Sequence, residues 1–453
     1  MRLRQEARET MRLALPIAFG QVALMAMGLV DAALVGHVSQ AELAVVSLGN
    51  SLSFAVVCPA LGVSMAIEPL TAQAVGAGDA ARAWDTVRAG TLACLLLAAP
   101  TALATWASAR ALGPLGVEAA LVPGVERYVL ARLLGLPAFM LFMAGKSFLE
   151  ARGVVRPLWV GGWVANVLNF VWSSLLVFGD RALARVGLPP VGLPALGSVG
   201  AGLATSASNV VLAAIVWAAV FRARPPGARL LGGARALAPA ARKALGLGAP
   251  IGFQVFTEVG IFSCATVLAG RLGATTAAAH QIALGVASFS YMGVLGLANA
   301  TAVRVGRAVG AGEPGGPRRA GLVGLALTTS YMLGCALVLV AGGRLVASLF
   351  SPDPDVVAAA TPLLLIAALF QIADGAQGVM SGALRGAADS RFASVANLVC
   401  HWGFGLPVAY ALAFFAGWGA PGLWWGLLAG LVAVAAALVR RFLALTSRPI
   451  APA

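Results

Sequence analysis

The sequence predicts an all-α membrane protein in which twelve transmembrane helices form two six-helix bundles, related by a pseudo-two-fold axis along the membrane normal. Three observations lead to this fold class. Of the 453 residues, 60% are hydrophobic and 11% are charged, and the mean hydropathy is +0.90, whereas soluble domains carry about 25% charged residues. Long apolar runs recur along the whole chain, and the second half repeats motifs of the first.

Each predicted helix is an apolar run of about 20 residues, which is the length that crosses the hydrocarbon core of a bilayer. The runs are rich in Ala, Leu, Val and Gly, whereas a transmembrane strand would show about ten residues of alternating polarity. The predicted segments are residues 13–35, 44–66, 88–111, 128–149, 157–179, 199–221, 244–269, 277–302, 320–342, 360–382, 393–415 and 419–439.

Membrane topology, rather than nucleic-acid binding, explains the net charge of +14. Cytoplasmic loops of membrane proteins carry an excess of Lys and Arg, and most of the 31 basic residues lie on one side if both termini are cytoplasmic. The richest of these loops also contains the Pro and Gly of a linker. We therefore expect an N-terminal six-helix lobe at 1–221, a cytoplasmic basic linker at 222–243 and a C-terminal six-helix lobe at 244–453.

An internal repeat supports the two-lobe arrangement. The chain reads AVGAGD from Ala74 and AVGAGE from Ala308, each time just after the second helix of its half. Because each unit has six helices, both copies enter the membrane from the same side, and the repeat is a parallel one with its binding site expected between the halves. Two further matches share the same spacing: Ala14–Ile17 with Gly248–Ile251, and Val35–His37 with Ala269–Arg271.

Three carboxylates lie well inside the predicted helices: Asp31 in the first, Glu258 in the seventh and Asp374 in the tenth. A charged side chain at the centre of a membrane helix costs about 2.5–3.5 kcal/mol on insertion scales, so a functional role is the default interpretation. The repeat does not copy these acids, because Leu24 corresponds to Glu258 and Ala265 corresponds to Asp31.

Amide side chains extend two of these positions into polar stripes. Gln254 lies four residues before Glu258, and Gln371 and Gln377 lie three residues on either side of Asp374. Residues at these spacings share a helix face. We interpret Glu258 and Asp374 as a cation or proton site, which could hold Na⁺, with the three glutamines as supporting polar residues.

A separate polar cluster is expected in the first half, where Asp31 and Asn169 lie in different predicted helices. For each acid the alternative is a protonated, hydrogen-bonded packing residue. Glu68 lies near the inner end of the second helix, beside Pro69. It is a candidate gate, and the alternative is simple exposure at the membrane interface.

Several stretches together resemble the multidrug and toxic compound extrusion (MATE) transporters, and more narrowly their NorM-like branch. The resemblance covers essentially the whole chain, and the glutamate of the seventh helix separates this branch from the DinF-like one. The stretches are ALPIAFGQVALMAMGLVDAALVGHVS at 14–39, APIGFQVFTEVGIF at 249–262, AAAHQIALGVASFSYMGVLGLANATAVRVGRAVGAGE at 277–313 and QIADGAQGVMSGALRG at 371–386.

The resemblance implies that Glu258 and Asp374 bind the coupling Na⁺ or H⁺, and that Asp31 belongs to a first-half site that couples protons or contacts substrate. One position departs from the family: a tyrosine often found four residues before the tenth-helix aspartate is Phe370 here. The missing hydroxyl removes a potential oxygen ligand, which favours H⁺ over Na⁺.

The expected function is efflux of lipophilic, often cationic drugs or dyes in exchange for H⁺ or Na⁺ by alternating access. We expect a monomer in the bacterial inner membrane, with no cofactor, no enzymatic activity and no nucleic-acid partner. A lipid-linked oligosaccharide flippase of the same superfamily is the alternative. An intramembrane aspartyl protease using Asp31 and Asp374 is a remote one, because neither aspartate lies in a GxGD motif.

Overall fold

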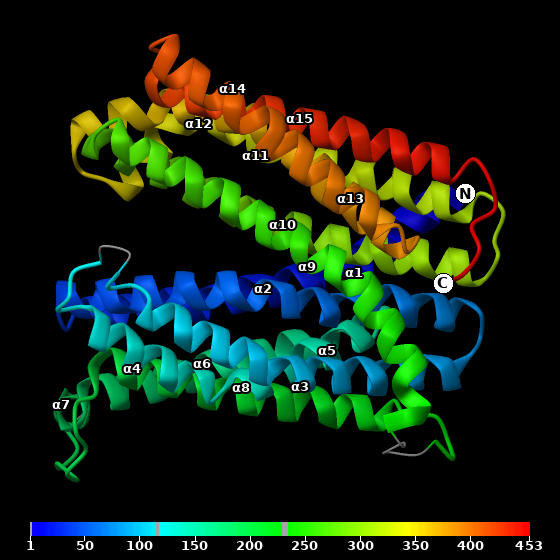
Figure 1. The fold of residues 1–453 in the computed structure, drawn as a ribbon, viewed down its shortest axis with the longest axis horizontal. Helices are drawn as coiled ribbons and strands as arrows, with labels where there is room; N and C mark the ends of the chain where they lie inside the picture. The colour runs from blue at the N-terminus through cyan, green and yellow to red at the C-terminus, as the bar shows by residue number, and fades with distance from the viewer. Residues whose placement is uncertain (1, 115–116, 186, 229–233) are drawn as a thin grey trace. The chain divides into compact units, whose positions relative to one another are not determined.

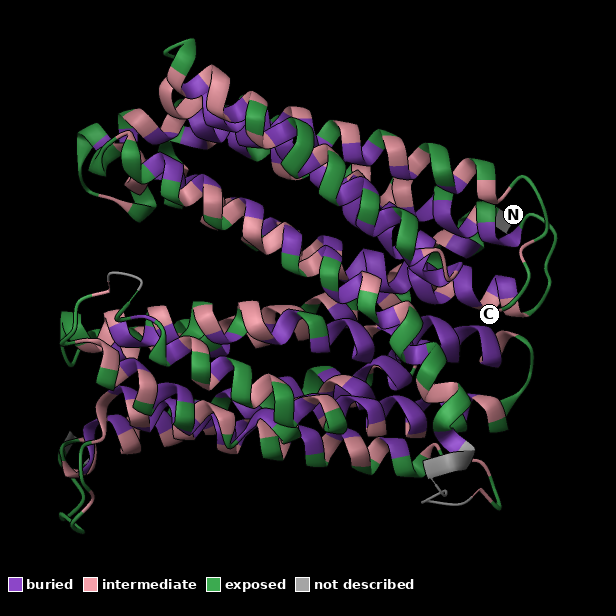
Figure 2. Cartoon of the chain, in the orientation of Figure 1, coloured by how far each residue is buried: buried purple, intermediate pink, exposed green. Residues whose placement is uncertain are grey.

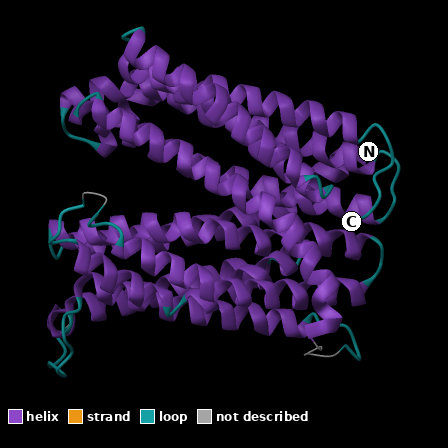
Figure 3. Ribbon diagram, in the orientation of Figure 1, coloured by secondary structure: helices purple, strands orange, loops and turns teal. Residues whose placement is uncertain are grey.

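The protein is helical throughout the residues that the structure, a computed structural model, describes: 2–114, 117–185, 187–228 and 234–453. Within these residues there are helices and loops but no strands (Figure 3). Among the described residues, eleven helices are long and apolar enough to cross a membrane, and counting one bent pair as a single span raises the number to twelve. The prediction of an all-helical, multi-pass membrane chain is confirmed.

The helices extend beyond the predicted segments because backbone hydrogen bonding continues past the apolar run. Residues Ser390–Phe415 form one span from α13, α14 and two π-helical stretches, Leu398–Gly405 and Ala411–Phe415. The α-helices are α1 (Arg2–Gly36), α2 (Gln40–Gly76), α3 (Ala80–Arg110), α4 (Val122–Leu133), α5 (Leu136–Arg152), α6 (Arg156–Phe178), α7 (Asp180–Arg185), α8 (Gly197–Arg222), α9 (Ala234–Arg271), α10 (Ala274–Gly310), α11 (Gly316–Phe350), α12 (Pro354–Gly386), α13 (Ser390–Asn397), α14 (Leu406–Tyr410) and α15 (Gly419–Leu445).

The predicted segment at 128–149 is not one straight helix. It is formed by α4 and α5, which meet at an angle of 49°. Pro137 follows Gly135 at this break. A proline within a helix removes one backbone hydrogen bond and its ring clashes with the carbonyl of the residue four positions earlier, so the helix bends here.

Residue contacts divide the chain into two compact units. One contains Met1–Ala18, Glu68–Asp79 and Phe253–Ala453, and the other contains Phe19–Ile67 and Ala80–Gly252. The helices α1, α2 and α9 therefore contribute to both units. The division by chain order into 1–221, 222–243 and 244–453 remains a prediction, and residues 229–233 of the expected linker lie outside the described residues.

Helix α12 is the central element of the first unit. It packs against α10, α11 and α15 (Figure 1). More than half of the residues in its most apolar stretch are buried. By contrast, α11 exposes much of its surface (Figure 2). A polar residue on α12 is therefore surrounded by protein, while the exposed faces of α11 carry the apolar side chains expected at a lipid surface.

The repeated AVGAG motifs bring the ends of α2 and α10 into a close, reciprocal contact inside the first unit. A Cβ placed on Gly76 would lie 2.1 Å from the Arg307 carbonyl oxygen, and one on Gly310 would lie 1.9 Å from the Gln73 carbonyl oxygen. At the repeat spacing Gly76 corresponds to Gly310, and Gln73 corresponds to Arg307. The crossing therefore has local two-fold symmetry, and no residue larger than glycine fits at either position without displacing backbone.

The same motifs end both helices. Gly78 and Gly312 adopt the left-handed conformation, with φ of +75° and +61°. The Asp79 amide donates to the Ala74 carbonyl at 2.9 Å. This pattern is the Schellman C-cap, which satisfies the last carbonyls of a helix. The conspicuous glycines of the repeat are thus explained by helix termination and close packing, without any bound group.

Helix α12 ends in the same way but without glycine. Ala388 has a φ of 61°, and the Asp389 amide donates to the Leu384 carbonyl at 2.8 Å. The left-handed conformation costs an L-residue roughly 1–2 kcal/mol. We expect Ala388→Gly to stabilise the protein by about 1 kcal/mol, measured as a higher thermal transition in detergent. A lower transition would show that the Ala388 methyl contributes packing that outweighs the backbone cost.

Candidate functional site: buried carboxylates

In the first unit, Glu258 of α9 is held by α12. The Gln377 side-chain amide donates to Glu258 Oε1 at 2.7 Å. A second contact lies one helical turn away on each helix, where Gln254 Nε2 donates to Ser381 Oγ at 2.9 Å. These two contacts align the polar faces of α9 and α12, so the stripes read from the sequence face each other.

Asp374 belongs to the same site. Its carboxylate lies within electrostatic range of Glu258, and its side chain is buried among the helices around α12. Two ionised carboxylates in apolar surroundings repel each other, and an added cation or proton relieves this repulsion. A pair of this kind favours the binding of positive charge, and its role as a cation or proton site stays a prediction.

Tyr291 of α10 completes one side of the site. A Cβ on Gly378 would lie 2.9 Å from the Tyr291 hydroxyl oxygen, so glycine at this position gives the phenol access to α12. Tyr291 lies within electrostatic range of both Glu258 and Asp374. Farther along α12, small residues continue this contact, since a Cβ on Gly382 would lie 2.4 Å from the Ala298 carbonyl oxygen.

Arg385 brings a positive charge to the same polar network. Its guanidinium donates to Asn299 Oδ1 at 3.2 Å, and it lies within electrostatic range of Glu258. Arg385 is buried. A fixed cation near Glu258 lowers the cost of keeping that carboxylate ionised inside the protein.

The amide groups around Asp374 have unused hydrogen-bonding capacity. Gln371 is completely buried, and neither its Oε1 nor its Nε2 has a hydrogen-bond partner among the described residues. The Oε1 atom of Gln377 also has no hydrogen-bond partner among the described residues. Buried polar atoms without partners are rare and call for an explanation. Oxygen atoms of this kind, with two carboxylates, are the ligands that a hard cation prefers.

The donor set fits Na⁺ or H⁺ better than a transition metal. Within the described residues there is no group of three or more His, Cys, Asp or Glu side chains that could hold a metal ion. A Na⁺ ion at this site would use Glu258 and Asp374 together with amide oxygens. Phe370 supplies no oxygen: it is buried and packs edge-on against Trp424 and Phe262, with ring centroids 5.4 and 6.1 Å away.

Asp31 forms a separate site in the second unit. Ser173 of α6 donates to its Oδ1 at 2.7 Å, and the Thr205 hydroxyl of α8 donates to its Oδ2. Asn169 and Arg132 lie within electrostatic range of the same carboxylate, but neither amide atom of the Asn169 side chain has a hydrogen-bond partner among the described residues. Asp31 is buried, so these donors replace the water that would otherwise solvate it. The structure places Asp31 and Asn169 in the same unit, and their joint role as a polar cluster stays a prediction.

Glu68 is buried, with 4% of its surface exposed. The alternative of simple interfacial exposure is therefore wrong, because α2 carries this residue into the first unit, where protein surrounds it. Glu68 is the first residue of α2 that belongs to that unit.

Four residues near the three acids are not among the site residues predicted from the sequence: Ser173, Thr205, Tyr291 and Arg385. Ser173 and Thr205 could not be singled out, because hydroxyl residues occur in many membrane helices, where they bond to their own backbone. Tyr291 gave no signal beyond being a tyrosine inside a helix. Arg385 did have one, since it is a lone arginine in the GALRG stretch of an otherwise apolar helix.

These features define a polytopic helical membrane protein with several carboxylates inside its spans. The chain belongs to the MatE family, whose model matches residues 16–175 and 250–411. The two matched stretches begin at the spacing of the internal repeat, which agrees with duplication of one six-helix unit. The family is one of transporters rather than enzymes.

Relatives with known names are similar along nearly the whole chain. A probable multidrug resistance protein NorM of Deinococcus radiodurans is 38% identical over 97% of this chain and 95% of its own length. The multidrug resistance protein PmpM of Pseudomonas aeruginosa is 34% identical over 97% of this chain and 92% of its own length. The crystal structure of a mutant of the Vibrio cholerae MATE transporter VcmN matches with a TM-score of 0.88 at 21% identity, covering 99% of both chains.

Proposed function

We propose that this protein is a multidrug efflux antiporter of the bacterial inner membrane. It exports lipophilic, often cationic small molecules in exchange for H⁺ or Na⁺ by alternating access, as a monomer with both termini in the cytoplasm. The names of the relatives support the substrate class. The distribution of arginines supports the orientation.

The single observation that carries the coupling proposal is the hydrogen bond from Gln377 to Glu258, which joins α12 to α9 beside Asp374. Glu258 and Asp374 bind the coupling cation, and Gln254, Gln371 and Gln377 position them. Cation binding neutralises the acids, which weakens attraction for a cationic drug and favours its release. Each positive charge that enters gains about 2.3 kcal/mol per 100 mV of membrane potential.

Asp31 has a different role in this proposal. Its two oxygens already accept hydrogen bonds from Ser173 and Thr205, so a proton or a polar substrate group that binds there must compete with them. Protonation of Asp31 would release one of the hydroxyls, which is a means of coupling charge to the packing of α6 and α8. Glu68 acts as a gate residue, since it is a buried acid on α2, which contributes to both compact units.

The flippase alternative is less well supported by the chemistry. A pyrophosphate-linked substrate carries negative charge and needs a cationic cavity, whereas Asp31, Glu258 and Asp374 supply negative charge inside the spans. The buried basic residues Arg385 and Lys146 each have an acid nearby: Arg385 lies within electrostatic range of Glu258, and Lys146 pairs with Glu150 at 3.1 Å.

Ethidium efflux from vesicles tests the proposed function. The purified chain is reconstituted, dye is loaded, and a Na⁺ pulse and a pH jump are applied separately. We expect an inward H⁺ gradient to drive efflux. A response to neither ion would overturn the antiporter proposal, while a flippase would leave dye in place and move labelled lipid-linked oligosaccharide instead.

Phe370→Tyr tests the choice of ion. Phe370 lies one helical turn before Asp374, so a tyrosine would place an oxygen on the same face of α12. We expect efflux driven by Na⁺ to increase at least several-fold in this variant, while efflux driven by H⁺ stays within about two-fold. Phe289→Tyr, at an exposed position of α10, is the matched control. Equal Na⁺ responses in both variants would remove Phe370 from the ion-selectivity argument.

A further inference from the structure

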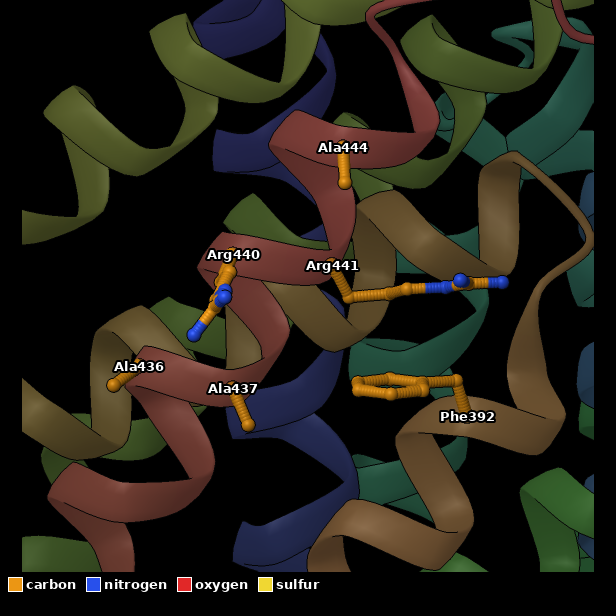
Figure 4. Close-up of a pocket in the computed structure, with 6 residues that line it drawn as sticks. All are labelled: Phe392, Ala436, Ala437, Arg440, Arg441 and Ala444. Atoms are coloured by element: carbon orange, nitrogen blue, oxygen red, sulfur yellow. The ribbon is translucent and has the colours of Figure 1, made fainter.

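A groove lies between the start of α13 and the end of α15, away from the buried carboxylates (Figure 4). Its volume is about 450 Å³. One wall is the ring of Phe392, and the other is a face of α15 built from alanines and arginines. The α15 residues are Ala436, Ala437, Arg440, Arg441 and Ala444.

The two arginines of the groove differ in how they are held. Arg441 Nε lies 2.7 Å from Asp389 Oδ2, and its guanidinium lies 5.2 Å from the centre of the Phe392 ring. Arg440 is exposed, points in a different direction (Figure 4), and makes no hydrogen bond or ion pair with the part of the chain that the structure describes. Asp389 neutralises one arginine, which leaves the charge of Arg440 available to an anion.

The groove continues into an apolar surface along the α13 span. Phe392, Val395 and Val399 follow one another at helical spacing on one face, and the two valines are 60% and 57% exposed. On a span long and apolar enough to cross a membrane, such a face borders acyl chains. The arginines stand at the end of α15, where long basic side chains reach the headgroup layer.

We propose that this groove is a binding site for an anionic phospholipid. The lipid phosphate lies against Arg440 with Arg441 beside it, and an acyl chain follows Phe392 and the exposed valines. Arginine suits this role because its planar guanidinium donates two parallel hydrogen bonds to a phosphate. A free phosphate would use the arginines alone and leave the apolar wall uncovered, whereas a membrane lipid uses both. The site requires membrane insertion only and does not depend on the transport proposal.

Lipid titration of the purified full chain tests the site. Phosphatidylglycerol and phosphatidylcholine with the same acyl chains are added in detergent, and bound lipid is counted by native mass spectrometry. We expect one phosphatidylglycerol to bind more tightly than phosphatidylcholine, and Arg440→Gln to weaken it about five-fold, in line with the usual contribution of one basic residue. Arg440→Gln with Arg441→Gln should weaken it further.

The matched control is Arg222→Gln, which removes an exposed arginine at the end of α8 and should leave this lipid bound. Ala444→Phe keeps both charges but fills the mouth of the groove, and it should weaken phosphatidylglycerol binding as strongly as the loss of Arg440. Two results overturn the proposal: equal binding by wild type and the double arginine variant, or equal protection from thermal unfolding by soluble glycerol phosphate.

Discussion

Glu258→Gln and Asp374→Asn are each expected to abolish dye efflux while the protein remains folded in the membrane. Both changes keep the size of the side chain and one acceptor oxygen, and they remove its charge. An ion about 4 Å from a carboxylate gains roughly 4 kcal/mol at an effective dielectric constant of 20. Loss of one carboxylate should therefore weaken binding of the coupling cation by at least about 100-fold.

The measurement is ethidium efflux driven by an imposed ion gradient, with the amount of protein in the vesicles determined in parallel. Asp355→Asn is the matched control, because Asp355 is an exposed acid in the first turn of the same helix, α12. We expect the control to transport at the wild-type rate. Full efflux by both Glu258→Gln and Asp374→Asn would show that these acids are packing residues.

Gly310→Leu is expected to have the second largest effect, because it forces the ends of α2 and α10 apart. A Cβ at this position would lie 1.9 Å from the Gln73 carbonyl oxygen, which is a backbone atom and cannot rotate away. Overpacking of this kind typically costs about 1–3 kcal/mol. We expect a lower thermal transition in detergent and slower efflux, and the same for Gly76→Leu at the symmetry-related position.

Two comparisons make this prediction specific. Gly334→Leu places the same side chain at an exposed position of α11 where nothing lies within 4 Å, and it should leave stability unchanged. The double variant of Gly76 and Gly310 should lose less stability than the two single variants lose in sum, since both changes act on one contact. Wild-type stability and efflux in both single variants would show that this crossing opens without cost.

A network of ion pairs accompanies the crossing in the first unit. Arg304 of α10 donates to both oxygens of Glu6, at 2.7 and 2.8 Å, and also pairs with Glu9 of α1 at 2.5 Å. The Gln73 amide donates to the Gly386 carbonyl at 3.0 Å. The first turns of α1 and the end of α2 are thus bound to α10 and α12, far along the chain from them.

Sequence patterns could predict the spans, the repeat and the three acids, because these depend on local physics. An apolar run must cross a bilayer as a helix, since only internal hydrogen bonds satisfy its backbone in hydrocarbon. A carboxylate within such a run, as at Glu258, is conspicuous because of its insertion cost. Helix faces also follow from spacing alone, which is why the sequence predicts that Gln254 and Gln377 lie on polar stripes.

Tertiary structure alone decided which groups meet. The hydrogen bond from Gln377 to Glu258, the hydroxyl donors of Asp31 and the approach of Tyr291 past Gly378 depend on the orientation and separation of helices, and spacing within one helix contains no information about either. The division of α1, α2 and α9 between the two compact units also depends on tertiary structure, because it follows from contacts between helices that are far apart in the chain.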